Sequence, residues 1–380
     1  MSVFKLAFPK INLSGVGSID ALIERLTAEH AGDKGLLICD PTLVELGFAN
    51  KLMESELELT LFKDVRPNPD TNTVNQALAM YQKSDARYII GFGGGSSIDT
   101  AKAIRILSAN PAPIANYNGV EKVSKLGAPL YAINTTAGTA AEVTSNAVIT
   151  DTATHVKHVI ISDKIIPDIS VNDPSVMLGI PSATTAATGI DALTHALESY
   201  VSVGAHKLTD YISLEAISTI AQSLPQAVDD GSDINSREIM AYGQFIAGLS
   251  FNSAGLGMVH AMAHPAGAHK DLPHGVCNAI LLPIVSEFNR PYRVEKFAQV
   301  AKALGVDTSD MDSEQASVAA IDALNALNRR VGIPRGFAEL GVSEEDILAW
   351  VDDALADPCA GGNPAPMTRE QVIELYHKAL

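Results

Sequence analysis

Short apolar runs alternate with amphipathic segments between about residues 20 and 170, and this alternation constrains the fold most strongly. Four apolar runs predict buried strands: GLLICD (35–40), LTLFKDV (59–65), RYIIGFG (87–93) and PLYAINT (129–135). Helices are expected between them, at 21–30, 71–83 and 98–109. Because parallel strands need crossover connections, this pattern predicts an α/β fold with a parallel sheet covered on both faces.

The pattern changes near residue 180, after which strand signals almost vanish. Ala/Leu/Ile-rich segments with helical spacing follow at 191–202, 207–224, 236–251, 293–304 and 315–331. We therefore place an α/β domain over residues 1–180 and an all-helical domain over residues 181–380. Neither a low-complexity linker nor an internal repeat occurs, so we expect the two domains to pack closely around a cleft.

The charge and composition exclude several classes of partner. The chain has 380 residues and a net charge of −17, which disfavours nucleic acid and anionic membranes. No signal-peptide pattern and no apolar run of membrane-spanning length is present. The 3 cysteines form no CxxC motif, which argues against a disulfide framework or a cysteine-type zinc site. A cytoplasmic protein is expected.

Two segments of the second half carry residues suited to metal binding. Asp191 and His195 stand four apart in GIDALTHALE, so on a helix both side chains would leave the same face. The segment VHAMAHPAGAHKDLPHG holds four of the chain's 10 histidines, His260, His264, His269 and His274. A single helical histidine is usually structural. A carboxylate and several imidazoles converging from two helices instead predict a site for Fe(II), Zn(II) or a similar ion.

A glycine-rich turn is the strongest signal of the first half. In GFGGGSSIDTAK (91–102) a predicted strand runs into glycines and a helix follows at once. Glycines allow close approach of a ligand, and amides at a helix start favour a phosphate. Ser96 followed by Asp99 also predicts an ordinary N-cap with an acidic N3 residue. The turn departs from the standard dinucleotide motif, because Ser96 stands at the third glycine position.

Two other loops follow predicted strands. Asp40 is the last residue of the predicted strand GLLICD (35–40). At this position a carboxylate can accept hydrogen bonds from an adenosine ribose, or it can simply begin a loop before Pro41. NTTAGTAAEVT (134–144) follows another strand, and its threonines and glycine could line a nucleotide groove or form a turn. Since ligands of open α/β sheets bind at the carboxyl ends of the strands, we expect these loops and the glycine-rich turn to share one crevice.

On these motifs the chain resembles the iron-containing (group III) alcohol dehydrogenases over essentially its whole length. The motifs are Asp40, PNPD (67–70), GGGSSIDTAK (93–102), NTTAGTAAEVT (134–144), AATGIDALTHALE (186–198), the 255–283 segment ending in PHGVCNAILLP, and NP at 363–364. The resemblance implies a homodimeric enzyme that interconverts small primary alcohols or diols and aldehydes with NAD(P). It also implies Rossmann-like dinucleotide binding by the first domain and metal binding by the second.

The resemblance further implies roles for individual residues. The metal ligands would be Asp191, His195, His260 and His274, holding Fe(II), with Zn(II) as the alternative. His264 matches a histidine near the nicotinamide, and we expect it either to relay the alcohol proton or to pack and hydrogen-bond there. Asp40 matches the residue associated with a preference for NAD over NADP. The matched cofactor contacts are Asn68, Gly94, Gly95, Ser96, Thr135, Thr136, Thr139 and Lys157.

Two alternatives remain open at this point. One is a glycerol-dehydrogenase-like or dehydroquinate-synthase-like enzyme on zinc, although those relatives use a different ligand set. The other is a catalytically silent protein that binds nucleotide and metal. The chain also departs from its relatives at Ala141, where a serine is usual, and at His269 and Lys270, where aromatic residues are common. These departures concern the polarity of the pocket more than the class of reaction.

Overall fold

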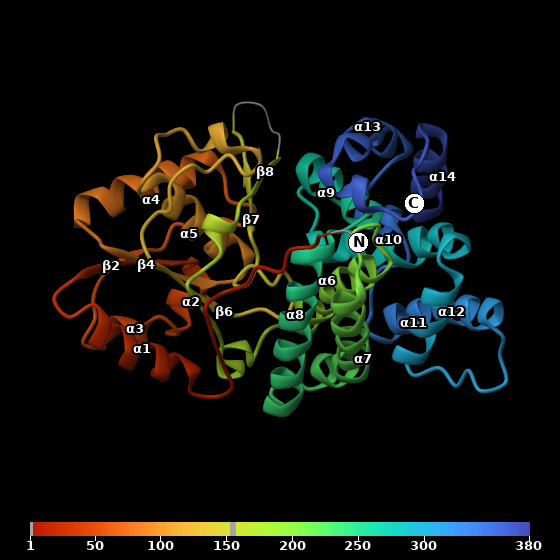
Figure 1. The fold of residues 1–380 in the computed structure, drawn as a ribbon, viewed down its shortest axis with the longest axis horizontal. Helices are drawn as coiled ribbons and strands as arrows, with labels where there is room; N and C mark the ends of the chain where they lie inside the picture. The colour runs from red at the N-terminus through yellow and green to blue at the C-terminus, as the bar shows by residue number, and fades with distance from the viewer. Residues whose placement is uncertain (1–2, 153–156) are drawn as a thin grey trace. The chain divides into compact units, whose positions relative to one another are not determined.

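The computed structural model describes residues 3–152 and 157–380 (Figure 1). The chain forms two compact units. An α/β unit contains Ala7–Thr136 and Ala140–Met177, and a helical unit is built mainly from Leu178–Leu380. The short segment Ala137–Thr139 belongs to the helical unit although it lies within the first half of the sequence.

A six-stranded sheet forms the centre of the α/β unit, with the strand order β1-β9-β6-β4-β2-β3. Every pairing in it is parallel. In that order the strands are β1 (Ile11–Ser14), β9 (Ile169–Asn172), β6 (Leu130–Asn134), β4 (Tyr88–Gly93), β2 (Lys34–Cys39) and β3 (Glu58–Phe62). The four predicted strands and the parallel sheet are confirmed. β1 and β9 were not predicted, because each is only 4 residues long and half polar.

Helices cover this sheet on both faces (Figure 1). One side carries α1 (Ser18–Glu29), α2 (Pro41–Glu45) and α3 (Asn50–Met53), and the other carries α4 (Thr71–Ser84) and α5 (Gly95–Leu107). Along β2, Leu36 and Ile38 enter the core beneath α4 and α5, whereas Leu37 and Cys39 enter the core beneath α1 to α3. A strand buried on both faces is apolar at every position, which explains the continuous apolar runs of the sequence.

A second, three-stranded sheet of order β5-β8-β7 adjoins α5. Its strands are β5 (Gly119–Val120), β8 (Lys157–Ile161) and β7 (Asn146–Thr150). The side chain of Asp99 on α5 accepts a hydrogen bond from the Val148 amide at 3.0 Å. Buried Lys102 donates to the Asn146 carbonyl at 2.7 Å. These two hydrogen bonds connect β7 of the small sheet to α5, the helix that follows the glycine-rich turn.

The helical unit has no strand among its described residues, which confirms the helical second half. Its helices are α6 (Ser182–Val201), α7 (Lys207–Asp229), α8 (Ile234–Ala254), α9 (Met258–Lys270), α10 (His274–Asn289), α11 (Val294–Ala303), α12 (Ser313–Arg330), α13 (Glu344–Ala356) and α14 (Arg369–Ala379). In the described parts of both units, the short 3₁₀ turns are η1 (Ile114–Tyr117), η2 (Asp163–Ile165), η3 (Pro174–Met177), η4 (Arg290–Tyr292), η5 (Phe337–Leu340) and η6 (Pro358–Gly362). Among the described helices none is by itself long and apolar enough to cross a membrane. α8 and α9 reach that length and composition only as a pair bent by 104°.

Helix α6 is the central element of this unit. It is buried over almost its whole length because α7, α8 and α10 pack around it. Two glycines make the approach of its neighbours possible. A Cβ on Gly275 of α10 would lie 2.4 Å from the Ala187 carbonyl oxygen, and one on Gly189 would lie 2.3 Å from Leu224 Cδ1 of α7. The glycine after His274 therefore brings the first turn of α10 against α6.

Candidate metal centre and nucleotide loops

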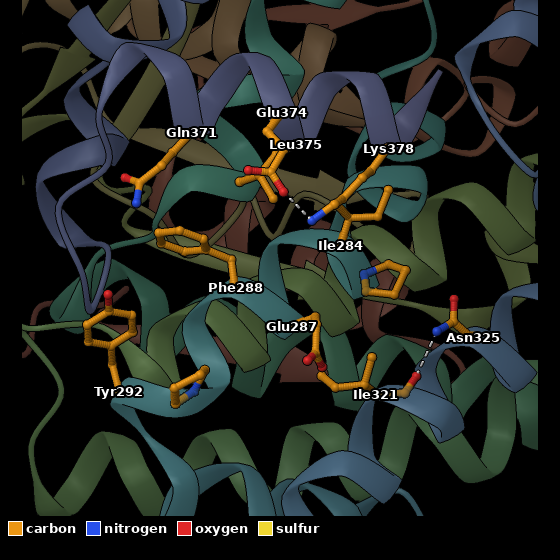
Figure 2. A pocket seen from close by; sticks show the side chains of 12 residues that line it. Ile284, Glu287, Phe288, Tyr292, Ile321, Asn325, Gln371, Glu374, Leu375 and Lys378 are labelled. Atoms are coloured by element: carbon orange, nitrogen blue, oxygen red, sulfur yellow. Dashed lines mark hydrogen bonds and ion pairs between the residues drawn. The ribbon is translucent and has the colours of Figure 1, made fainter.

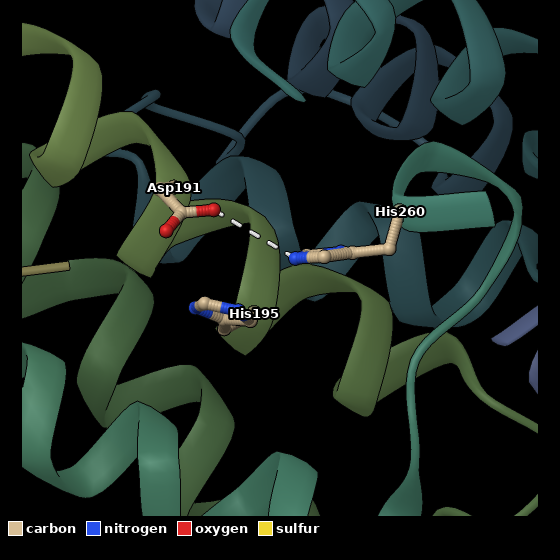
Figure 3. A group of neighbouring side chains, drawn as sticks. All are labelled: Asp191, His195 and His260. Carbon is tan, nitrogen blue, oxygen red and sulfur yellow. Dashed lines mark ion pairs between the residues drawn. The ribbon is translucent and has the colours of Figure 1, made fainter. Parts of the chain in front are cut away.

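Three of the predicted metal ligands form one buried group (Figure 3). Asp191 and His195 project from the same face of α6, and His260 faces them from the first turn of α9. One ligand atom from each lies within 4.8 Å of the other two. The rings of His195 and His260 stack with centroids 4.6 Å apart. The Nε2 atom of His260 is 3.7 Å from Asp191 Oδ1.

His274, the first residue of α10, also belongs to this group. Its Nε2 atom is also 3.7 Å from Asp191 Oδ1, and its ring centroid lies 5.3 Å from that of His260. The structure thus brings all four predicted ligands together, but from three helices and not from the two that were predicted. The reason is Pro273, which disfavours helical backbone at the residue before it, so that α9 ends at Lys270 and α10 begins at His274.

The electrostatics of the group suit a divalent cation. Burial opposes the charge of Asp191, but His195, His274 and His260 together hold its pKa well below the usual range. Burial lowers the pKa of His195 to about 4, against the attraction of Asp191. Burial also opposes the charge of His260, but the Asp191 and Glu198 carboxylates beside it raise its pKa to about 9. A carboxylate with neighbouring imidazoles is the donor set that Fe(II) and Zn(II) accept, and binding would displace a proton from His260.

Two buried atoms support the same conclusion. The Nδ1 atom of His195 and the Oδ1 atom of Asn278 have no hydrogen-bond partner among the described residues. Asn278 was not predicted to take part. Its amide nitrogen donates to Asp191 Oδ1 at 2.7 Å and lies 3.1 Å from Nε2 of both His260 and His274. It stands one turn beyond His274 on α10, so helical spacing from a predicted ligand was the available signal.

Glu198 is the second residue that the sequence predictions missed. Its Oε2 atom lies 2.6 Å from His260 Nδ1, and its Oε1 atom accepts the Val259 amide at 2.7 Å. It follows Asp191 by seven positions and His195 by three, so all three side chains share one face of α6. That spacing was visible in the sequence.

The predicted catalytic residue His264 lies beside the four ligands. Its ring stacks on His274 with centroids 5.3 Å apart and planes inclined by 14°. Its Nδ1 atom is 2.7 Å from Asp357 Oδ2. Burial opposes the charge of Asp357, but the bond and attraction of His264 outweigh it and lower the pKa of that carboxyl. Ligand atoms of His264, Asp357 and Cys359 also lie within 4.8 Å of one another.

The Asn-Pro motif at 363–364 fixes the start of α9. The Oδ1 atom of Asn363 accepts the Met258 amide at 3.2 Å. Its amide group exchanges two hydrogen bonds with the buried amide of Asn289, at 2.9 and 2.8 Å. The motif therefore acts on the backbone that precedes His260.

Two features of the helical unit lie apart from this group. His269 is 46% exposed and its Nε2 atom pairs with Asp353 Oδ2 at 2.8 Å. The helical unit contains a pocket of about 600 Å³ lined by residues of α10, η4, α12 and α14. Figure 2 shows Ile284, Phe288 and Leu375 among the side chains that line it. None of the predicted site residues lines this pocket.

The glycine-rich turn of the α/β unit leaves its helix without a side-chain cap. Helix α5 begins at Gly95, its N-cap residue is Gly94, and no side chain bonds to its first amides. The predicted cap by Ser96 is therefore wrong. Ser96 lies inside the first turn, and Asp99 bonds to Val148 across to β7. Uncapped amides at a helix start are what an anion site requires.

Asp40 and the loop after β6 both lie against this turn. A Cβ on Gly93 would be 3.3 Å from Asp40 Oδ2, and one on Gly94 would be 3.3 Å from Thr136 Oγ1. The Thr135 amide donates to the Gly93 carbonyl at 3.1 Å. Gly93 has a φ of +148°, a conformation that favours glycine. The other oxygen of Asp40 caps α2, so the capping and ligand-binding interpretations of this residue are compatible.

The remaining predicted cofactor residues fall into two places. Lys157 Nζ of β8 donates to Asn68 Oδ1 at 3.3 Å, so these two lie together. Asn68 itself has a φ of +52°, a left-handed conformation that asparagine tolerates better than most residues. Thr139, in contrast, belongs to the helical unit with Gly138, whose backbone hydrogen-bonds with His195.

Two family models together match most of the chain. Residues 9–174 match the model described as "Iron-containing alcohol dehydrogenase". Residues 185–380 match the model described as "Fe-containing alcohol dehydrogenase family, C-terminal".

Individual relatives match over nearly their whole lengths. Lactaldehyde reductase of Escherichia coli (strain K12) is 44% identical over 371 residues, 96% of each chain. The NAD-dependent methanol dehydrogenase of Bacillus methanolicus is 39% identical over 98% of each. A crystal structure of 1,3-propanediol oxidoreductase superposes with a TM-score of 0.97, 40% identity and full coverage of both chains. The chain is therefore an oxidoreductase that uses a metal ion and NAD(H), and it belongs to the iron-containing alcohol dehydrogenase family.

Proposed function

We propose that the protein transfers a hydride between NAD(H) and a small primary alcohol or diol, or the matching aldehyde, with Fe(II) as its metal. The observation that carries this proposal is the convergence of Asp191, His195, His260 and His274. Relatives named for lactaldehyde, methanol and 1,3-propanediol support a small oxygenated substrate. Zn(II) is the alternative metal, because both ions accept nitrogen and oxygen donors.

The four side chains would hold the ion in the helical unit. When bound, the cation supplies Lewis-acid stabilisation of negative charge on the substrate oxygen. Buried Asp191 contributes the anionic donor, and the three imidazoles present neutral donors around it. The amide of Asn278 donates to Asp191 and so fixes the direction of that carboxylate.

The α/β unit would hold the dinucleotide, which serves as hydride acceptor or donor. We assign the phosphates to the uncapped amides at Gly94, Gly95 and Ser96. Asp40 would accept hydrogen bonds from the adenosine ribose, and further contacts are proposed from Asn68, Thr135, Thr136, Thr139 and Lys157. We propose that residues 1–180 bind the nucleotide, although Thr139 belongs to the helical unit, and that residues 181–380 bind the metal.

His264 would carry the proton of the alcohol. Because its Nδ1 atom is bonded to Asp357, the Nε2 atom is the one that can exchange a proton with substrate or solvent. Proton transfer by a positioned histidine is the ordinary route in general acid–base catalysis. The competing role is packing between His274 and Asp357, which would support the site without taking part in the reaction.

We propose a homodimer that works in the cytoplasm on small molecules. The net charge of −17 disfavours association with nucleic acid or anionic membranes.

Two alternative functions compete with this proposal. A glycerol-dehydrogenase-like zinc enzyme is disfavoured by the complete Asp-His-His-His set. A silent nucleotide- and metal-binding protein would bind NADH yet reduce or oxidise nothing. A steady-state assay with a panel of short alcohols and aldehydes separates that last alternative from the proposal.

Replacement of a metal ligand tests the site. His260→Ala and His274→Ala should each lose most bound divalent metal and most turnover, because each removes one of four donors. NADH should still bind, since the nucleotide loops lie in the other unit. Metal analysis of protein purified without air and NADH titration measure both effects. His269→Ala is the matched control and should keep its metal. Full metal content with near-normal turnover in either ligand variant would contradict the assignment.

Replacement of Asp40 tests the choice of cofactor. Asp40→Gly should improve the use of NADPH relative to NADH by about tenfold to a hundredfold, because like charges at close range cost about 1–3 kcal/mol. Asp40→Asn should give a similar gain while keeping the cap of α2, which separates charge from helix stability. The ratio of kcat/KM for the two cofactors is the measurement. A wild-type enzyme that already prefers NADPH would overturn this prediction.

Replacement of His264 tests the proton relay. His264→Ala should lower the turnover of alcohol oxidation by about 10²-fold, the low end for acid–base catalysis. Metal content and NADH affinity should stay at wild-type values, since His264 is not among the four ligands. A packing role predicts the opposite pattern, with lower thermal stability, weaker NADH binding and near-normal turnover at saturation. Loss of the metal would show that the histidines have been assigned in the wrong order.

A further inference from the structure

We infer that Glu198 is a positioning residue of the metal centre, which holds the His260 ring so that Nε2 faces the other ligands. The inference rests on the proposed ligand set, Asp191, His195, His260 and His274. It adds Glu198, which acts on the metal through His260. Glu198 has a side chain that is 3% exposed, and it comes from α6, the helix that also carries Asp191 and His195.

The two oxygens of Glu198 bind two consecutive residues of α9. Oε1 accepts the backbone amide of Val259 at 2.7 Å, and Oε2 lies 2.6 Å from Nδ1 of His260. One carboxylate therefore fixes both the backbone before His260 and the ring itself. Since α6 supplies the carboxylate, the distance between α6 and the His260 ring is set by a direct bond between the two helices.

This contact selects one tautomer of His260. A carboxylate only accepts hydrogen bonds, so the Nδ1 atom must carry a proton to bond to Oε2. A neutral imidazole protonated at Nδ1 presents its lone pair at Nε2. The Nε2 atom is the one that lies 3.7 Å from Asp191 Oδ1. Glu198 thus holds the tautomer and orientation that a metal ligand requires.

The start of α9 depends on the same carboxylate. Its N-cap residue, Gly257, has no side chain to bond the first amides. Those amides are instead bonded by Glu198, at Val259, and by Asn363, at Met258. A Cβ on Gly257 would lie 3.0 Å from both Glu198 Oε1 and Asn363 Oδ1, so the glycine makes room for them. A negative group near a helix N-terminus is also favourable, which helps to stabilise a buried carboxylate.

A glutamine at position 198 separates the positioning role from mere helix capping. Its carbonyl oxygen could still accept the Val259 amide, so capping would survive. Its amide group would then face Nδ1 of His260, and two donors would oppose each other. Relief requires either that the ring proton moves to Nε2, where it competes with a cation, or that the amide turns over and gives up the Val259 bond. An aspartate keeps the accepting oxygens but is shorter by one methylene.

The experiment measures the affinity of the metal-free protein for Zn(II) alone, by competition with a chromophoric chelator. Glu198→Gln should bind Zn(II) about 10–100-fold more weakly than the wild type, the usual loss for such a contact to a ligand. Glu198→Asp should bind more tightly than Glu198→Gln, because the carboxylate is retained. Glu238→Gln, which changes an exposed side chain of α8, should bind like the wild type. In ¹⁵N-histidine spectra recorded at a pH where the His260 ring is neutral, the tautomer protonated at Nδ1 should dominate in the wild type and be depleted in Glu198→Gln.

The outcomes distinguish the inference from the proposal beneath it. If His260→Ala and His274→Ala bind Zn(II) as tightly as the wild type, the ligand set is wrong whatever Glu198 does. If those variants lose affinity but Glu198→Gln does not, the positioning role is wrong and the ligand set stands. A capping role alone predicts that Glu198→Gln exceeds Glu198→Asp in affinity, because glutamine matches the length of glutamate. If Glu198→Gln binds Zn(II) more tightly than Glu198→Asp, the inference is therefore wrong, whichever of the two variants has the lower thermal stability.

Discussion

The burial of Asp191 inside the helical unit is the constraint on which the rest of the site depends. Removing a carboxylate from water costs several kcal/mol unless hydrogen bonds and opposite charges replace the solvent. Here the replacements are the Asn278 amide, at 2.7 Å, and the rings of His195, His260 and His274. Each comes from a separate position on α6, α9 or α10, so these helices must meet at one point. The packing that buries Asp191 therefore also gathers the four donors of the proposed metal site at one place.

Several residues around the four metal donors position α9 and α10 against α6. Pro273 separates α9 from α10 and lets His260 and His274 approach from different directions. Gly275 allows the first turn of α10 to touch the backbone of α6 at Ala187. Asn363 and Glu198 bond the amides at the start of α9. Much of what makes this sequence recognisable as a family member therefore concerns backbone placement, with the chemistry left to a few side chains.

The sequence predicted the parallel sheet and the helical second half because both depend on local hydrophobic periodicity. It did not predict β1, β9 or the small sheet, since their strands are only 2 to 5 residues long, contain polar positions and gain their register from neighbours elsewhere in the chain. Ser96 matched the residue type of a cap, but backbone geometry placed the cap at Gly94, a choice that composition does not reveal. The four donors could be named from their motifs. Glu198 and Asn278 could not be assigned a role, because a contact between α6 and α9, or between α10 and its neighbours, requires the packing of helices to be known.

The most direct test of this account is to locate the metal by anomalous scattering. Crystals of the protein purified without air would be measured on both sides of the iron and zinc absorption edges. The account predicts a single strong peak bounded by Asp191, His195, His260 and His274, within bonding distance of all four. A peak held by His264, Asp357 and Cys359, or one that leaves any of the four donors outside bonding distance, would contradict it.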